Sequence, residues 1–170
     1  VKLPMLTSCC PAWVRFIEHH FPEMKDIPSS ARSPQQMFGS IAKTYFADQI
    51  KEKRENMVVV SIMPCLAKKY ESQRDEFRVD DNPDVDFSIT TRELAHLIKE
   101  ANFHLKDMPD EDFDRPMGES TGAGVIFGTT GGVIEAATRT AYELYTGNSL
   151  DDRIEFDQLR GFDAIRKATV

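Results

Sequence analysis

The chain has 170 residues, of which 41% are hydrophobic and 29% are charged, a composition typical of one globular domain with a core of its own. The net charge of −7, with no Lys- or Arg-rich run to offset it, argues against nonspecific binding to nucleic acid. The longest apolar run, residues 57–63, is too short to cross a bilayer, so we expect no membrane insertion.

The three cysteines of the chain are better suited to free thiols than to a disulfide framework. Cys9 and Cys10 are adjacent and can bond to each other only through a strained ring, and Cys65 is the one other cysteine. Free thiols are typical of a reducing cytosol, and no secretory signal opens the chain. We therefore expect a cytoplasmic protein.

The first third of the sequence predicts a short strand and two helices. The apolar segment 3–7 leads to Pro11, which suits a first helical position, and apolar residues at helical spacing predict a helix over 11–20. Farther along, Ser33 is a predicted N-cap, with Gln36 closing a capping box. The predicted buried stripe of this second helix consists of Met37, Ile41, Ala42 and Tyr45.

The middle of the chain predicts two strands that each lead into a helix. Residues 57–62 form a nearly continuous β-branched run, which is typical of a strand buried on both faces in a parallel sheet. A short helical stretch through 68–71 follows. Residues 85–89 alternate apolar and polar, as a half-covered strand does, and Thr90 with Glu93 forms a capping box before the next helix.

The last third predicts a long loop, a glycine-rich segment and a final helix. Residues 103–117 are polar and acidic, and a helical pattern over 133–145 follows the glycines. Residues 154–159 are a predicted last strand. This alternation of strands and helices predicts an α/β fold, a mainly parallel sheet flanked by helices, in a single domain over 1–170.

Two cysteines lie where ligands of such a sheet bind. Ligands lie outside the carboxyl ends of parallel strands, and Cys10 and Cys65 each follow an apolar strand and begin a helix. The positive end of a helix favours a thiolate, and Lys68 would add a positive charge one turn later. Two such cysteines suit one side of an iron–sulfur cluster, which needs about four ligands. Spacing alone leaves open that both are buried, inert thiols.

The remaining polar motifs have simpler structural interpretations. The glycines before the last helix could cradle phosphate or let backbone approach a bulky cofactor, but no Walker lysine follows them. His19 and His20 are adjacent and face different directions, so we expect no metal site built from both. Glu71, Glu93 and Glu119 would carry protons only if they lined a cavity.

Two segments taken together resemble the signatures of a known enzyme family. Residues 7–13, TSCCPAW, resemble the T-S-C-C-P-x-W signature of iron-only, [FeFe]-type hydrogenases, and residues 63–71, MPCLAKKYE, resemble their M-P-C-x-x-K-x-x-E signature. Residues 29–36, SSARSPQQ, are similar to the intervening segment, and the resemblance extends to 86–94 and 118–132. The chain therefore resembles about one lobe of the two-lobed hydrogenase catalytic domain.

The resemblance implies reversible reduction of protons to H2 at an H-cluster, in which a [4Fe–4S] cubane is linked to a diiron subcluster carrying CO and cyanide. Cys10 and Cys65 would be ligands of the cubane. Cys9 would be the proton-transfer thiol, Ser29 would relay that proton, and Lys68 would donate a hydrogen bond to a cyanide. The residues implied to surround the cofactor are Met63, Pro64, Ser33, Gln35 and Phe127.

The resemblance also implies partners. The other two cubane cysteines belong to a family signature expected after Val170, so we expect the isolated chain to bind no native cluster and to be inactive. The parent enzyme would act with the rest of the hydrogenase chain and with cluster maturation proteins. Its electrons would come from ferredoxin or from an NAD(P)-linked iron–sulfur carrier.

Two other function classes stay open. One is a hydrogenase-like iron–sulfur assembly or scaffold protein that shares the fold without hydrogen chemistry, and the other is an unrelated α/β binding domain with buried cysteines. Cys9, Met63 and Lys68 separate the classes, because only the diiron chemistry needs a proton-delivering thiol and a cyanide partner. All three residues are present, which favours the enzyme.

Overall fold

The chain divides into two compact units, Val1–Pro116 and Met117–Val170. The expected single domain over 1–170 therefore stays a prediction, and each unit is described by itself. Within the described residues, no helix is long and apolar enough to cross a membrane. The computed structural model describes residues 6–119, 121–129, 131–150, 157–159 and 162–167.

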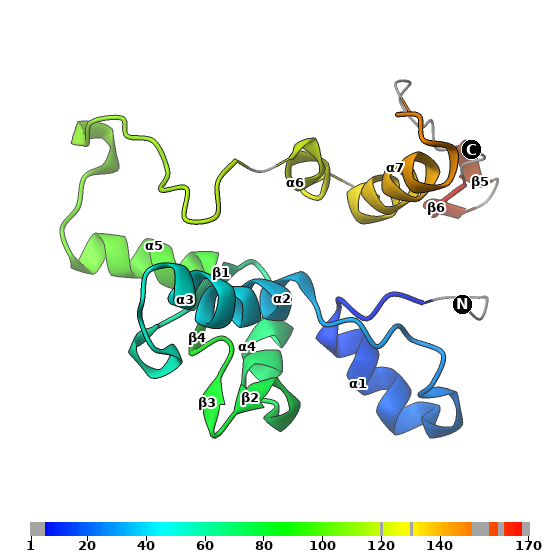
Figure 1. The fold of residues 1–170 in the computed structure, drawn as a ribbon, viewed down its shortest axis with the longest axis horizontal. Helices are drawn as coiled ribbons and strands as arrows, with labels where there is room; N and C mark the ends of the chain where they lie inside the picture. The colour runs from blue at the N-terminus through cyan, green and yellow to red at the C-terminus, as the bar shows by residue number, and fades with distance from the viewer. Residues whose placement is uncertain (1–5, 120, 130, 151–156, 160–161, 168–170) are drawn as a thin grey trace. The chain divides into compact units, whose positions relative to one another are not determined.

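Helices and short strands alternate along the first unit (Figure 1). Its helices are α1 (Pro11–His20), α2 (Pro34–Ile41), α3 (Ala47–Gln49), α4 (Ala67–Ser72) and α5 (Thr91–Glu100). Its strands are β1 (Val60–Met63), β2 (Arg78–Val79), β3 (Asn82–Pro83) and β4 (Phe87–Thr90). A π-helix, Ala42–Phe46, joins α2 to α3, and 3-10 turns lie at Pro22–Met24, Arg54–Asn56, Asp75–Phe77 and Leu105–Asp107. The predicted helices over 11–20 and 68–71 are confirmed, as is the loop that follows α5.

The second unit contains two helices and an antiparallel strand pair. The helices are α6 (Gly122–Ile126) and α7 (Gly132–Thr146), and the strands are β5 (Asp157–Leu159) and β6 (Phe162–Lys167). Helix α7 confirms the helical pattern over 133–145. Of the predicted strand over 154–159, residues 157–159 form β5, and residues 154–156 lie outside the described residues. Strand β6 was not predicted.

A parallel strand pair carries the α/β character of the first unit. Strands β1 and β4 pair in parallel, with Val60 opposite Phe87 and Met63 opposite Thr90. Helix α4 lies between them in the chain, as a parallel crossover requires. Of the predicted first strand at 3–7, residues 3–5 lie outside the described residues, and Leu6 makes a single parallel bridge. The predicted α/β fold with a parallel sheet is thus confirmed.

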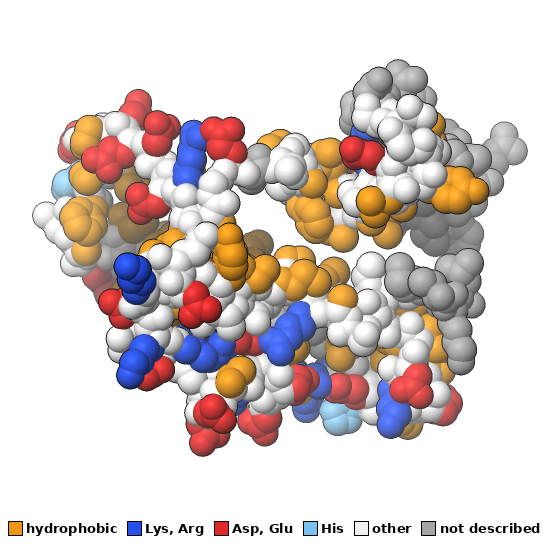
Figure 2. All heavy atoms as spheres, in the orientation of Figure 1, with side chains coloured by type: hydrophobic (Ala, Val, Ile, Leu, Met, Phe, Trp, Pro, Cys, Tyr) orange, Lys and Arg blue, Asp and Glu red, His pale blue; other side chains and the backbone are white. Residues whose placement is uncertain are grey.

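Strand β1 is covered on one face only, so the predicted burial of both its faces is wrong. Val59 is 8% exposed and packs with Ala42 and Val85 in the core, whereas Val58, Val60 and Ile62 are 66%, 50% and 48% exposed. Apolar side chains are accordingly visible on the surface of this unit (Figure 2). A β-branched run shows that both faces are apolar but cannot show which elements cover them.

Helix α2 also turns a different face inward from the one predicted. Of the predicted stripe only Ala42 is buried, while Met37, Ile41 and Tyr45 are exposed. The cause is Gly39, where an added Cβ would lie 2.5 Å from the Asp84 carbonyl oxygen. The backbone after β3 therefore packs on the glycine face, and the buried residues there are Gln35, Gln36, Gly39, Ala42 and Lys43.

The predicted capping box of α2 is half formed. The Ser33 hydroxyl accepts a hydrogen bond from the backbone N–H of Gln36 at 3.3 Å, as an N-cap should. The side-chain amide of Gln36 is buried and has no hydrogen-bond partner among the described residues, so the reciprocal bond is missing. Ser33 alone caps this helix.

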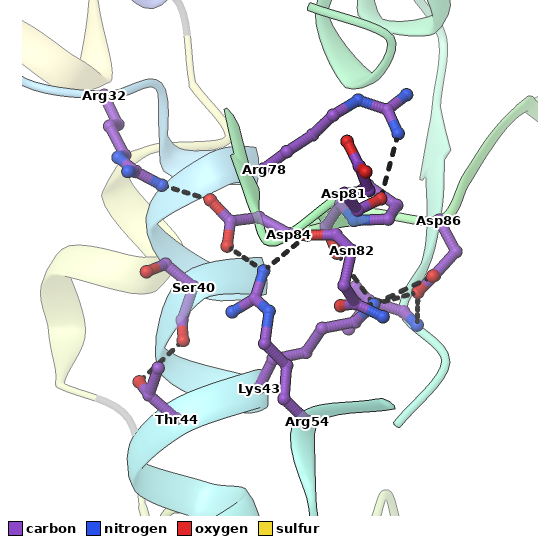
Figure 3. A network of polar contacts seen from close by, with 12 residues as sticks. Arg32, Ser40, Lys43, Thr44, Arg54, Arg78, Asp81, Asn82, Asp84 and Asp86 are labelled. Carbon is purple, nitrogen blue, oxygen red and sulfur yellow. Dashed lines mark hydrogen bonds and ion pairs between the residues drawn. The ribbon is translucent and has the colours of Figure 1, made fainter. Parts of the chain in front are cut away.

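Buried ion pairs hold the segment between β3 and β4 against α2 and the π-helix (Figure 3). Arg32 and Arg54 both bind the carboxylate of Asp84, which is completely buried. The Lys43 ammonium donates to Asn82 Oδ1, the Pro83 carbonyl and Asp86 Oδ1, at 3.1, 2.7 and 2.8 Å. All three of its donors are therefore used, and the charge is buried without an unmet hydrogen bond.

Replacing Asp84 by asparagine is expected to destabilise the protein by about 3 kcal/mol, because it leaves two arginines at a buried site without their counter-charge. Chemical denaturation of the variant measures this loss. Asp75→Asn is the matched control, since Asp75 is fully exposed, and it should change the stability by less than about 0.5 kcal/mol. Equal unfolding midpoints for the two variants would contradict the structural role of Asp84.

The capping box of α5 is complete and gives a pH-dependent prediction. Hydrogen bonds from Lys69 first, and then from Thr90, hold the pKa of the Glu93 carboxyl at about 2, well below its usual range. A lowered folded-state pKa contributes stability above the unfolded pKa, and this contribution is lost as pH falls from about 5 to about 2. In thermal unfolding across this range, Glu93→Gln should lose this part of the pH dependence and Glu100→Gln should keep it. Identical profiles for wild type and Glu93→Gln would refute the assignment.

Candidate functional site

The two cysteine-containing segments meet in the structure although they are far apart in the sequence. The Lys68 ammonium, on α4, donates a hydrogen bond to the backbone carbonyl oxygen of Cys9 at 2.8 Å, across 59 residues. Cys10 is the N-cap residue of α1, and Cys65 lies between the end of β1 and the start of α4. The segments that carry the three cysteines therefore lie at one place in the first unit.

Side-chain contacts fasten α1 to α4 and the turn that follows it. The Arg74 guanidinium donates two hydrogen bonds to the Glu18 carboxylate, of 2.6 and 3.1 Å. The Arg15 guanidinium donates to the Tyr70 hydroxyl at 2.7 Å and lies 4.8 Å from the centre of its ring. The hydrogen bond from Arg74 lowers the pKa of Glu18, and the same contact raises the pKa of Arg74. The helices that follow Cys10 and Cys65 are thereby fixed to each other.

The thiols themselves are free and accessible. Cys10 is exposed, and Cys9 and Cys65 are half-buried. The interpretation of Cys10 and Cys65 as two buried, inert cysteines is therefore wrong. Accessible thiols at the ends of adjacent segments fit one side of an iron–sulfur cluster. In the described parts of the chain no group of three or more His, Cys, Asp or Glu side chains could hold a metal ion.

Lys68 brings a positive charge to the backbone of the Cys9 segment from a buried position. Its side chain reaches the Cys9 carbonyl while the residue is only 8% exposed. Glu71, which is 3% exposed, accepts a second hydrogen bond from the same ammonium at 2.8 Å. Glu71 balances the charge of the ammonium, and the two hydrogen bonds leave one N–H of Lys68 that could bind a further acceptor.

Ser29 lies on a segment that pairs with the residues just before Cys9. The Ser29 backbone N–H donates to the Leu6 carbonyl at 2.7 Å, and the Ser8 hydroxyl donates to the Ala31 carbonyl at 2.8 Å. Ser29 and Glu71 also line one cavity of about 240 Å³. Glu71 thus meets the condition set for a proton carrier, whereas Glu93 closes a helix cap.

The other predicted residues fall into two groups. Met63 ends β1 half-buried, Pro64 after it is exposed, and Ser33 and Gln35 are buried at the start of α2. Phe127 lies in the second unit at the end of α6 and is 43% exposed. Its place beside the others therefore stays a prediction.

Sequence reasoning missed two polar side chains that make long-range hydrogen bonds in the first unit, the half-buried Ser61 and the buried Lys43. Ser61 lies on β1, where its hydroxyl donates to the Gln35 side chain at 2.7 Å. Its one signal was a serine inside an otherwise apolar strand. Lys43, a lysine within the apolar stretch Ile41–Phe46, gave a similar signal. Polar residues at buried positions need partners, and only the fold shows which partners they find.

The whole of the chain matches one protein family. The family model for the C-terminal domain of the iron-only hydrogenase large subunit matches residues 1–170. The chain belongs to the iron-only hydrogenase family. This membership confirms the resemblance of the two cysteine signatures.

Relatives of this hydrogenase chain agree with the assignment. The NADP-reducing hydrogenase subunit HndD of Solidesulfovibrio fructosivorans is 64% identical over 170 residues, which are 100% of this chain and 29% of that protein. The periplasmic [Fe] hydrogenase large subunit of Nitratidesulfovibrio vulgaris is 48% identical over 170 residues, 100% of this chain and 40% of the relative. The hydrogenase chain thus spans well under half the length of these relatives.

Solved structures give the same fold. The apo [FeFe]-hydrogenase HydA1 from Chlamydomonas reinhardtii matches with a TM-score of 0.82 and 46% sequence identity, covering 97% of this hydrogenase chain and 41% of that one. A more distant relative, Protein NAR1 of Arabidopsis thaliana, is 31% identical over 174 residues, covering 95% of this chain and 37% of that protein.

Proposed function

We propose that this chain is part of the catalytic domain of an [FeFe] hydrogenase that catalyses the reversible reaction of two protons and two electrons to H2. The proposal rests on one observation above the others. The two cysteine signatures, 59 residues apart at their point of contact, are joined by the hydrogen bond from Lys68 to the Cys9 carbonyl. Family membership supports the reaction class.

Different residues of this chain would bind the cluster and transfer protons. Cys10 and Cys65 would hold the [4Fe–4S] cubane through their accessible thiolates, with the remaining ligands coming from the rest of the enzyme. When bound, the linked diiron group would supply the electron chemistry that interconverts protons and H2. Met63, Pro64, Ser33, Gln35 and Phe127 would surround that group.

Proton movement is assigned to Cys9 and Ser29. The Cys9 thiol would hold the proton next to the reacting centre, and Ser29 would pass it on toward the cavity that it lines. The pairing of the two segments, through Ser29 with Leu6 and Ser8 with Ala31, keeps the two groups on neighbouring strands of backbone. A short, ordered route of this kind suits general acid–base transfer.

The full-length protein produced with cluster maturation proteins tests the function. It should evolve H2 from a reduced low-potential donor and exchange deuterium between D2O and H2. Loss of both activities in the Cys65→Ala variant is expected, because that thiolate would hold the cubane. A wild-type protein that carries its clusters but shows neither reaction would contradict the proposal.

The second candidate function is iron–sulfur cluster assembly without hydrogen chemistry, which is favoured by the 36% identity over 118 residues to a protein of Yarrowia lipolytica named cytosolic Fe-S cluster assembly factor NAR1. Such a protein would bind a [4Fe–4S] cluster but no diiron group. Cys9, Met63 and Lys68 argue for the enzyme, since a scaffold needs neither a proton-delivering thiol nor a cyanide partner. The higher identity to HndD agrees with that preference.

The proposed enzyme needs partners that this chain does not itself provide. Ferredoxin or an NAD(P)-linked iron–sulfur carrier would deliver electrons, as the NADP-reducing relative suggests. Cluster maturation proteins and the rest of the hydrogenase chain would complete the site. We also propose a cytoplasmic location, although one relative is named as periplasmic. The isolated chain is proposed to be inactive, and CO and cyanide bands in its infrared spectrum would refute that.

A further inference from the structure

A chain of hydrogen-bonded side chains, half-buried at its Ser61 end and buried beyond it, connects strand β1 to the Lys68 ammonium. The Ser61 hydroxyl donates to Gln35 Oε1 at 2.7 Å, and Gln35 Nε2 lies 3.3 Å from the Lys68 carbonyl and 3.5 Å from Glu71 Oε2. Glu71 Oε2 in turn accepts from the Lys68 ammonium at 2.8 Å. These contacts link β1, α2 and α4, three elements that are separate in the sequence, and they end at the Cys9 carbonyl.

The Lys68 carbonyl and the Glu71 carboxylate decide which way the Gln35 amide faces. Both groups only accept, and only the amide nitrogen donates, so Nε2 is directed toward them. The reversed amide would place its oxygen against the carboxylate, which is unfavourable at a buried position. Gln35 Oε1 is then left to accept from the Ser61 hydroxyl, and this hydrogen bond holds the neutral donor in place beside Glu71.

Lys68 has one N–H donor without an acceptor among the described residues. A lysine ammonium has three N–H donors, and Lys68 uses one on the Cys9 carbonyl and one on Glu71. Among the residues that the structure describes, no third acceptor contacts it. With two donors engaged by the Cys9 carbonyl and Glu71, the third is left for an acceptor that this chain does not supply among the described residues.

We infer that Ser61, Gln35 and Glu71 form a positioning relay that aims the third Lys68 donor at the anionic ligand of the site. Ser61 and Glu71 are the new positioning residues in this account. The inference rests on the proposed function, because the ligand is the cyanide of the diiron group. It differs from a merely structural role, since it sets the hydrogen bonding of the ligand itself.

Infrared spectra of the matured full-length enzyme test the relay through the cyanide stretching bands. Ser61→Ala should shift and broaden these bands and reduce diiron retention about tenfold, the lower end of the effect expected when a residue that orients a group at a metal site is lost. Ser61→Thr keeps the hydroxyl and should restore the wild-type bands. Ser72→Ala is the matched control, because Ser72 is a serine inside the same unit whose hydroxyl donates instead to the Lys69 carbonyl.

The infrared bands of these variants separate the relay from the proposed function. Wild-type bands in Ser61→Ala, or an equal shift in Ser72→Ala, would overturn the relay while leaving the proposed function intact. A wild-type enzyme without CO and cyanide bands would instead contradict the proposed function. If Ser61→Ala does not fold, Ser61→Val, which matches the shape of Ser61→Thr but lacks the hydroxyl, carries the same expected shift.

Discussion

Replacing Cys9 by alanine in the full-length enzyme is expected to lower turnover by on the order of 10³-fold, the range for loss of a positioned proton donor. The half-buried Cys9 is tied into the site by its backbone carbonyl, which accepts from Lys68. That bond does not involve the side chain, so the variant should keep its clusters. Hydrogen evolution measures the loss, and infrared bands of wild-type intensity would show that assembly is intact.

A matched control for Cys9→Ala is Ser30→Ala, because Ser30 is exposed and neighbours the relay residue Ser29. It should evolve hydrogen at the wild-type rate. Retained hydrogen evolution in Cys9→Ala would remove that thiol from the mechanism. Loss of the infrared bands in Cys9→Ala would instead give Cys9 a role in holding the cofactor.

The second large effect is expected for Lys68→Asn. The shorter, neutral side chain cannot reach both the Cys9 carbonyl and Glu71, and it leaves the Glu71 carboxylate buried without its counter-charge. Breaking a buried ion pair in this way costs about 3–5 kcal/mol of stability. Loss of the donor to the cofactor should also reduce diiron retention about 10- to 100-fold, measured as iron content and infrared band intensity.

Lys69→Asn is the natural control, because the neighbouring lysine is partly exposed and pairs with Glu93 at the start of α5. It should retain the diiron group at the wild-type level. Unchanged diiron occupancy in Lys68→Asn would count against the cyanide contact. Equal losses in the two variants would point to a general weakening of α4.

Local sequence signals predicted the helices and caps of this chain well. Pro11, the Ser33 N-cap and the Thr90–Glu93 capping box each act within one turn of helix, and each is found where it was predicted. The cysteine segments were found through a resemblance, and the fold adds that Lys68 joins them. These features are local or are carried by short motifs, so one sequence is sufficient to reveal them.

Features that depend on long-range packing could not be predicted from the sequence. The inward face of α2 is decided by the approach of the Asp84 backbone to Gly39, across 45 positions of the chain, and apolar periodicity favoured the opposite face. The partners of Lys43 and Ser61 likewise come from distant segments. A buried polar side chain has many acceptable partners in principle, and only tertiary structure selects one set.

The infrared spectrum of the matured full-length protein tests the central claim most directly. In the proposed enzyme, the two cysteine signatures meet at Lys68 and form one side of the hydrogenase site. We therefore expect stretching bands of both CO and cyanide from a bound diiron group. The same bands should weaken in Lys68→Asn and persist in Lys69→Asn. A protein that holds its [4Fe–4S] clusters but shows no such bands would contradict the claim and would favour a role in cluster assembly.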